Sequence, residues 1–498
     1  MEALTMEREP ISSVQLMERA ANTCALRILD LLRKGELNSF RRGLVVAGMG
    51  NNGGDGLVIS RVLQEAGIPV RVVLAKHREE GSPEHVANMR LWREAGGEVL
   101  ELDASIAGFQ VAEDEFVVDA LFGTGLSLQP TGWLRALVET INACGNPVVA
   151  IDLPSGMTGP GDPFEPEACI HAKWTFTFEV PRMPLLIAET GQYAGNWDLL
   201  PIGLDPIALA EAPRLGNWVT TPAIRGMLLP LPRYSHKGTR GHAFVSAGSK
   251  GMFGAAVLAV KGALRSGAGL VTAHVPGDLA PLMATTVPDA MTTADPSRTR
   301  LSTLPDLDRY DALAIGPGLG QEQDSKEMIR KCLMVKNIPM VLDADALNII
   351  AADPGLLRSI PLGAVLTPHP KEMDRLLGTA SRSGFERLER ARTFAQEHAC
   401  TVVLKGAYTC TCTPAGDLYF NSTGNAGLAK GGSGDVLTGL LVGQIAQGYP
   451  VEDAAIIAAF VHGLAGDITR DELGMDGMRP SDLVERIPSA WMRLRASE

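Results

Sequence analysis

The sequence predicts an α/β protein with two domains. Short buried strands alternate with helices along most of the chain, a pattern typical of parallel sheets covered on both faces. Several strands run directly into glycine-rich polar turns, and 498 residues are too many for one ordinary domain. Residues 204–232 are rich in proline and poor in periodicity, so we place the domain junction there, near Gly216. The predicted domains are residues 1–215 and 216–498.

The composition argues against several classes of partner. The formal net charge is −12 and no long basic run occurs, so neither nucleic acid nor an anionic membrane is an expected partner. No signal-peptide pattern and no apolar run long enough to span a bilayer is visible. The seven cysteines are scattered and form no C-x-x-C pair, which is typical of a reducing compartment. We therefore expect a soluble, cytoplasmic protein.

Helices and strands alternate in the first half. Residues 12–34 repeat apolar residues at helical spacing and predict one long helix. Strand 44–48 runs into the turn MGNNGGDG and then into a helix, LVISRVLQEAG. The alternation continues with the strand IPVRVVLA, a helix over 84–95, the strand EFVVDALFGTG, a helix over 133–143 and the strand PVVAIDLPSG.

Three of these strand ends carry polar side chains. The groups are Asn51, Asn52 and Asp55; Asp119 with the turn 123–125; and Asp152 with Ser155. Each carboxylate taken alone could simply cap the next turn. Because the carboxyl ends of parallel strands share one edge of a sheet, three such ends instead favour a ligand site. The hard oxygens of Asn52, Asp119 and Ser155 would suit a cation such as potassium better than zinc.

The motifs LMERAA, AGMGNNGGDGLVIS, VVDALFGTGL and VVAIDLPSGMTG make residues 12–203 resemble the YjeF N-terminal domain, the NAD(P)HX epimerase family. This resemblance implies a Rossmann-like fold and a potassium site at Asn52, Asp119 and Ser155. It also makes Asp119 the candidate for proton transfer, with Lys76, matched only by its place after a strand, as its partner. The residues implied to contact the hydrated nucleotide are Asn51, Asn52, Gly53, Gly54, Asp55, Gly123, Thr124, Gly125, Leu126, Ser127, Leu128, Gln129 and Asp152.

A second α/β pattern starts at about residue 235. HAFVSAG is a predicted strand, residues 254–267 form a small-residue helix, and LVTAHVP is a further strand. Strand-to-loop transitions follow in YDALAIGPGLG, PMVLDADAL and GAVLTPHPKE, before a strand and hairpin in TVVLKGAYTCTCTPAGDLYF. Within that hairpin Cys410 and Cys412 lie in the alternating sequence YTCTCTP, which is typical of a strand. We therefore expect both thiols on one face of the hairpin and no metal site there.

The stretch 425–440, NAGLAKGGSGDVLTGL, carries the chemistry of the second half. Gly431, Gly432 and Gly434 precede Asp435, and apolar residues follow at helical spacing. Glycines let the backbone approach an anion, and a helix N-terminus offers free N–H groups. A carboxylate there can take a proton from an alcohol beside the reacting phosphate. The alternative is a glycine-rich helix start with Asp435 as its cap.

Residues 220–490 resemble the ribokinase-like superfamily, and within it the ADP-dependent NAD(P)HX dehydratases. The resemblance rests on SHKG, GMFGAAVLA, IGPGLG, LDADALN, TPHPKE, VLKG and NAGLAKGGSGDVLTG, with His369 where vitamin kinases tend to carry asparagine. It implies that Ala255, Gly318, His369 and Asp435 contact the hydrated nucleotide. It further implies magnesium ordered near Glu372 and an ADP site at Lys405, Gly406, Ala407, Tyr408, Thr409 and Gly434.

Together the two resemblances imply a repair enzyme for hydrated NADH and NADPH (NADHX and NADPHX). The first domain would interconvert the R and S epimers with potassium. The second would dehydrate the S epimer with magnesium and ADP, giving AMP and phosphate. A homo-oligomer is expected. Two alternatives stay open, namely a small-molecule kinase acting on a vitamin precursor or sugar, and a non-catalytic binding or dimerisation role for the first domain.

Overall fold

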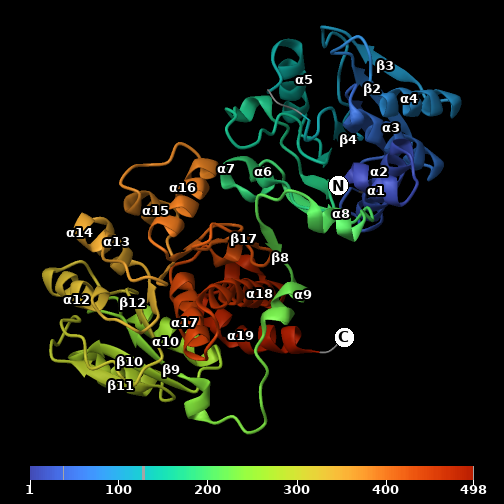
Figure 1. Cartoon of the computed structure of the whole chain (residues 1–498). Coiled ribbons are helices and arrows are strands. Elements are labelled where there is room, and N and C mark those ends of the chain that lie inside the picture. The colour runs from blue at the N-terminus through green and yellow to red at the C-terminus, as the bar shows by residue number, and fades with distance from the viewer. Residues whose placement is uncertain (38, 126–128, 497–498) are drawn as a thin grey trace. The chain divides into compact units, whose positions relative to one another are not determined.

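The computed structural model describes residues 1–37, 39–125 and 129–496, and it confirms an α/β protein with two domains (Figure 1). The two compact units are Met1–Arg214 and Leu215–Glu498, so the division lies close to the predicted junction at Gly216. The chain enters the second sheet directly after this division, because β8 (Asn217–Val219) pairs with β17 (Leu418–Asn421). Each unit contains its own sheet.

The first unit is built on a parallel sheet in the order β3-β2-β1-β4-β5-β6-β7. The chain winds outward in one direction from β1 to β3 and in the other from β4 to β7, so the order reverses between β1 and β4. Ligands of such sheets bind at this switch point. The strands are β1 (Arg42–Ala47), β2 (Val70–Ala75), β3 (Val99–Leu102), β4 (Glu115–Ala120), β5 (Val148–Ile151), β6 (Trp174–Phe178) and β7 (Asn196–Leu200).

Helices of the first unit cover both faces of this sheet. Val45 and Ala47 of β1 pack in one core with α2, α3 and α4, while Leu44 and Val46 pack in a second core with α5. This alternation follows from the two-residue period of a strand. The helices are α1 (Glu2–Arg8), α2 (Ser13–Arg33), α3 (Asn51–Glu65), α4 (Pro83–Glu94), α5 (Gly132–Ala143), α6 (Met183–Leu186), α7 (Ala188–Gly191) and α8 (Pro206–Glu211), with a 3-10 turn η1 (Pro166–Ala168).

In the first unit, the sequence pattern missed the edge strands β3 and β7 and the strand β6 next to β7. Their sequences, VLEL, WTFTF and NWDLL, mix polar and apolar residues and lack the continuous apolar run of the central strands. The predicted long first helix is confirmed as α2. Ser12 caps it, accepting a hydrogen bond from the Gln15 amide while the Gln15 side chain accepts one from the Ser12 amide.

The second unit contains a larger sheet in the order β11-β10-β9-β12-β13-β14-β15-β16-β17-β8. Only the pairings of β16 with its two neighbours are antiparallel, so the hairpin predicted before the glycine stretch is confirmed. The remaining strands are β9 (His242–Ser246), β10 (Leu270–Pro276), β11 (Met291–Asp295), β12 (Ala312–Ile315), β13 (Met340–Leu342), β14 (Val365–Leu366), β15 (Thr401–Leu404) and β16 (Cys410–Cys412).

The helix that carries Asp435 is almost entirely buried. This helix, α17, packs closely along α10 (Figure 1). A Cβ on Gly439 would clash with the carbonyl oxygen of Ala259, and one on Gly262 would lie 2.5 Å from that of Val436. The small-residue character of both segments therefore sets the position of the α17 N-terminus.

The other helices of the second unit flank the sheet or connect its strands. Long helices α18 and α19 join α10 and α17 in one apolar core. The helices are α9 (Thr221–Met227), α10 (Phe253–Arg265), α11 (Ala280–Thr286), α12 (Gln323–Leu333), α13 (Asp345–Ala351), α14 (Pro354–Leu357), α15 (Pro370–Leu376), α16 (Gly384–Glu397), α17 (Ser433–Ala446), α18 (Val451–Gly477) and α19 (Pro480–Arg495), with 3-10 turns η2 (Lys237–Arg240), η3 (Gly277–Leu279) and η4 (Ala426–Leu428).

No helix in the described part of the chain is both long and apolar enough to cross a membrane. Cys410 and Cys412 are buried in β16 as free thiols, two residues apart and therefore on one side of the strand. Among the described residues, no three His, Cys, Asp or Glu side chains are grouped to hold a metal ion.

Two candidate active sites

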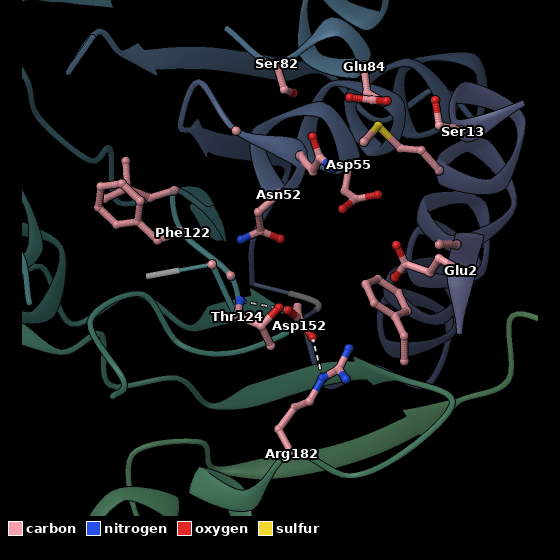
Figure 2. A pocket seen from close by; sticks show the side chains of 18 of the residues that line it. Glu2, Ser13, Asn52, Asp55, Ser82, Glu84, Phe122, Thr124, Asp152 and Arg182 are labelled. Atoms are coloured by element: carbon pink, nitrogen blue, oxygen red, sulfur yellow. Dashed lines mark hydrogen bonds and ion pairs between the residues drawn. The ribbon is translucent and has the colours of Figure 1, made fainter. Parts of the chain in front are cut away.

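A cavity of about 740 Å³ lies in the first unit, at the carboxyl ends of β1, β4 and β5 (Figure 2). It is the switch point of the sheet, and helices α1 and α2 contribute further walls. The structure brings together there, from three separate segments, eight of the residues singled out in the sequence: Asn51, Asn52, Asp55, Gly123, Thr124, Gly125, Gln129 and Asp152.

The two glycines of NNGGDG have a packing role. A Cβ on Gly53 would clash with the carbonyl oxygen of Gly48, and one on Gly54 would lie 2.7 Å from the sulfur of Met17. These glycines let the first turn of α3 lie directly on the end of β1 and against α2. Among the described residues, they do not line the cavity themselves.

Asn52 has a buried amide that faces the cavity (Figure 2). Neither its oxygen nor its nitrogen has a hydrogen-bond partner among the residues that the structure describes. A Cβ on Gly123 would lie 3.4 Å from the Asn52 Cγ and 3.0 Å from the Asp152 Oδ2, so these three segments are in close contact. Because buried amides are normally satisfied, Asn52 is suited to a bound ligand or ion.

Asp119 of β4 and Ser155 of the loop after β5 are buried and hydrogen-bonded to each other. The Ser155 hydroxyl donates to Asp119 Oδ1 at 2.6 Å, and the Ser155 amide donates to Oδ2 at 2.7 Å. Burial raises the pKa of Asp119 to about 6, although these hydrogen bonds oppose the shift. Within the described chain, neither residue lines the cavity.

Asp152 is held in a fixed orientation at the cavity wall. Its backbone has a φ of 66°, and its Oδ2 accepts a hydrogen bond from the Thr124 amide at 3.0 Å. Its Oδ1 lies 3.3 Å from the Nε of Arg182 in an ion pair (Figure 2). Arg182 also lines the cavity and was missed, because nothing in its local sequence distinguishes it.

Asp55 is a buried carboxyl that opens onto the cavity. Figure 2 shows it pointing into the space between Asn52 and Glu2. Burial raises its pKa well above the usual value, and the charges of Asp152 and Glu2 add to this effect. Glu2 comes from α1 and was also missed by the sequence analysis.

The other predicted residues of this site are placed less directly. The Lys76 side chain is 41% exposed, and its Nζ lies 3.7 Å from the Glu101 carboxylate. Lys76 is not among the described residues that line the cavity. Gln129 lines the cavity, but its amide donates to the carbonyl oxygens of Gly156 and Glu165. The predicted residues Leu126, Ser127 and Leu128 lie outside the described residues.

In the second unit, the glycine stretch becomes the N-terminus of α17. The N-cap is Gly432, with a φ of 103°, so the alternative reading of Asp435 as the cap is wrong. Asp435 lies in the first turn. Burial, followed by the charge of Asp343, raises its pKa to about 7, against the opposing effect of Lys405.

Lys405 brings three segments together at the end of β15. Its Nζ lies 2.9 Å from Asp343 Oδ1 and 4.0 Å from Glu372 Oε2. The same Nζ would lie 3.3 Å from a Cβ on Gly434, so glycine leaves room for the ammonium beside α17. Asp343 was not singled out in the sequence, although it directly follows a buried strand, as Asp152 does.

His369 and Glu372 form a capping box at the start of α15. The His369 Nδ1 accepts from the amides of Lys371 and Glu372, and Glu372 Oε2 accepts from the His369 amide at 2.9 Å. Burial, followed by the charge of Lys405, lowers the pKa of His369. The His369 side chain is 44% exposed, which leaves it accessible to a ligand.

The remaining predicted residues lie on α10 and in two loops. A Cβ on Gly318 would lie 3.0 Å from the Cβ of Ala255, so these two are neighbours. In the loop after β15, Gly406 and Ala407 are exposed, while Tyr408 and Thr409 are half-buried. The Gly406 amide donates to the Thr409 hydroxyl at 3.4 Å and closes the loop.

Comparison with known proteins gives the same division of the chain. The family model described as YjeF-related protein N-terminus matches residues 13–183, and that described as NAD(P)H-hydrate dehydratase matches residues 243–489. The bifunctional NAD(P)H-hydrate repair enzyme Nnr of Moorella thermoacetica is 37% identical, over 96% of this chain and 92% of its own. The enzyme of the same name from Escherichia coli is 34% identical, over 96% of this chain and 94% of its own.

Among solved structures, the ADP/ATP-dependent NAD(P)H-hydrate dehydratase of Bacillus subtilis, co-crystallised with ATP and Mg²⁺, is 30% identical with a TM-score of 0.48. It covers 56% of this chain and 99% of that chain. The full-length relatives and the two family matches agree on both halves. The chain therefore belongs to the family of bifunctional NAD(P)H-hydrate repair enzymes, with a YjeF-type first domain and a second domain of the NAD(P)H-hydrate dehydratase family.

Proposed function

We propose that the chain repairs hydrated NADH and NADPH, with epimerisation in the first unit and ADP-dependent dehydration in the second. The observation that carries the proposal is that one chain holds two distinct acidic sites. One is a cavity lined by Asp55 and Asp152 beside Asn52; the other places Asp435 in the first turn of α17, within electrostatic reach of Lys405. The relatives of matching length are named bifunctional NAD(P)H-hydrate repair enzymes, which supports two activities in one chain.

Epimerisation requires a group that moves a proton at the substrate. The hydrated ring carbon carries a hydroxyl group and the ring nitrogen, so its configuration can invert when the hydroxyl gains or loses a proton and a bond to carbon opens and re-forms. Asp119 is the predicted group. Asp55 is a second candidate, because it lines the cavity whereas Asp119 is engaged by Ser155. Lys76 would assist only if it left Glu101.

The potassium site predicted at Asn52, Asp119 and Ser155 fits the residues present. The Asn52 amide oxygen is buried without a partner among the described residues, and the other two supply carboxylate and hydroxyl oxygens, which potassium prefers. A bound cation would supply positive charge at this end of the sheet. The three residues would hold it where β4, β5 and α3 meet.

Dehydration begins with phosphoryl transfer to the ring hydroxyl. Asp435 would accept the hydroxyl proton, and a pKa of about 7 suits a general base near neutral pH. Lys405 and the α17 N-terminus would stabilise the charge of the transferring group. Phosphate then leaves with the ring oxygen and its electron pair, while loss of a proton from the neighbouring ring carbon forms the double bond.

The other predicted residues would hold the two substrates. We assign the hydrated nucleotide to Ala255, Gly318 and His369, and ADP to Gly434 and residues 405–409. Glu372 already accepts from the His369 amide and lies 4.0 Å from Lys405, so it would act on magnesium through ordered water. Magnesium bound with ADP supplies charge neutralisation at the phosphates.

The full-length protein tests this function directly. Mixed epimers of NADHX are incubated with ADP, and then with ATP, and the near-ultraviolet absorbance of NADH is followed. We expect complete conversion of both epimers. Conversion of the S epimer alone would contradict the epimerase assignment. The absence of nucleotide-dependent conversion would contradict the dehydratase assignment. A stable phosphorylated product would instead favour a small-molecule kinase. Repeating the assay with NADPHX gives the preference between the two substrates, and sedimentation tests the predicted homo-oligomer.

A further inference from the structure

Asp343 joins two elements of the dehydratase site although it occupies no predicted ligand position. It is 1% exposed and directly follows β13. One carboxylate oxygen accepts from Lys405 Nζ at 2.9 Å, and the other accepts from the Thr438 hydroxyl at 2.7 Å. A single side chain therefore bridges the end of β15 and helix α17.

The backbone holds this carboxylate in place. The Asp343 amide donates to the carbonyl oxygen of Ile315 at 3.2 Å, and its own carbonyl leaves no room for a side chain at Gly316. The next residue, Ala344, has a φ of 49°, a conformation that alanine rarely adopts. Strain of this kind persists only where the surroundings determine it, so the backbone beside Asp343 is held in place, and the two hydrogen bonds to Lys405 and Thr438 orient its carboxylate.

Thr438 and Asp435 share one face of α17. They are three residues apart, and residues at this spacing are neighbours on a helix surface. The bond from Thr438 to Asp343 therefore sets the rotation of α17 that presents Asp435. The hydrogen bond from Lys405 to Asp343 likewise fixes the start of the loop 405–409 next to Asp343.

We propose that Asp343 is a positioning residue of the dehydratase reaction. Its two oxygens hold Lys405 and Thr438 at one separation, which aligns the ADP loop with the helix that carries Asp435. The inference rests on the proposed dehydratase function.

An electrostatic signature distinguishes this role from a merely structural one. The charged and titratable groups around Asp435 are Asp343 and Lys405 at strand ends, Glu372 on α15 beside Lys405, and His462 on α18. Burial lowers the pKa of His462 to about 4, so it is neutral at working pH. Because the charge of Asp343 raises the pKa of Asp435, its removal should lower that pKa.

The decisive variant is Asp343→Asn in the full chain. A misplaced reacting group can cost about 10²-fold, so we expect kcat to fall by that order. The KM for ADP should not rise, because a negative charge beside Lys405 is lost. The acidic limb of kcat/KM should move to lower pH. Unchanged kcat, or a limb that stays in place, would overturn the inference.

Thr438 gives a pair of variants that keeps the test valid if Asp343→Asn fails to fold. Thr438→Val removes one bond but leaves the Asp343 charge, so kcat should fall with no shift of the acidic limb. Thr438→Ser keeps the hydroxyl and should restore kcat. A wild-type kcat in Thr438→Val would contradict the inference. The thermal melting transition of each variant controls for folding of the second unit, because the epimerase site lies in the other unit.

The outcome for the wild-type protein separates this inference from the proposed function. If the wild type shows no ADP-dependent recovery of NADH, the proposed function fails by itself. Calorimetric titration with magnesium and ADP then still tests Asp343. A tighter affinity of Asp343→Asn than of the wild type supports the inference, because Lys405 is released from Asp343, and an equal or weaker affinity contradicts it.

Discussion

The Ser155 hydroxyl lies 2.6 Å from Asp119 Oδ1, and the Ser155 amide lies 2.7 Å from Oδ2 of the same carboxylate. This pairing ties the end of β4 to the loop after β5, beneath the cavity of the first unit. It occupies the carboxylate that the sequence marks for proton transfer, while Asp55 remains open to the cavity. The two aspartates therefore have separable roles, and variants of each distinguish them.

The first prediction compares Asp55→Asn with Asp119→Asn. We expect Asp55→Asn to leave the R epimer unconsumed at normal thermal stability, because it removes a carboxyl that faces the substrate. Asp119→Asn should also slow R-epimer consumption, but with altered melting of the first unit, because a bridge between strands is lost. Chiral separation of residual NADHX gives the epimer rates. Normal R-epimer consumption in Asp55→Asn would return the proton transfer to Asp119.

The second prediction concerns potassium. Asn52→Leu removes the unpartnered buried amide at similar size, so it should abolish any rise in melting temperature that potassium chloride gives over choline chloride at equal ionic strength. Epimerase activity should fall, while dehydration of the S epimer continues. A potassium-dependent melting shift that survives in Asn52→Leu would place the cation elsewhere.

The third prediction concerns Asp435. A general base must be ionised, so the wild-type kcat/KM should rise with pH through about 7 and level off above it. Asp435→Asn should lower kcat about 10²–10⁴-fold and remove this rise. Epimer exchange should be intact. The surface variant Asp471→Asn, also in the second unit, is the matched control, and equal losses in both would refute the assignment.

The fourth prediction concerns Lys76. The structure pairs it with Glu101, and among the described residues it does not line the cavity. We therefore expect Lys76→Met to keep most of the epimerase rate. A loss as large as that of Asp55→Asn would show that Lys76 reaches the substrate, as the sequence resemblance implies.

The fifth prediction concerns helix packing. Gly439→Ala places a Cβ against the carbonyl oxygen of Ala259, so it should lower the free energy of unfolding of the second unit by about 1–3 kcal/mol. The control is Gly226→Ala in α9, where an added Cβ meets nothing within 4 Å and helix propensity should improve. Denaturant titration measures both. Equal stability of the two variants would contradict the packing argument.

Much of the fold could be predicted from the sequence because its signals are local. Apolar runs followed by glycine turns located the central strands of both sheets, helical spacing located α2, the alternation of strands and helices located α5, and small residues located α10. The outer strands β3 and β7 escaped because polar residues interrupt them. The same local logic located Asp119, near the end of β4, and Asp152, directly after β5.

The sequence by itself determined the two α/β domains, the strand ends that carry aspartates, and the helix start at Asp435. Only the tertiary structure decided which of these side chains face a ligand. In the tertiary structure Asp119 is hydrogen-bonded to Ser155, whereas Asp55, Glu2 and Arg182 line the cavity. The tertiary structure also joined Asp343 to Lys405 and Thr438, which lie 62 and 95 residues away. Contacts at such separation depend on how the strands are ordered and how the helices rotate, and no local pattern records either.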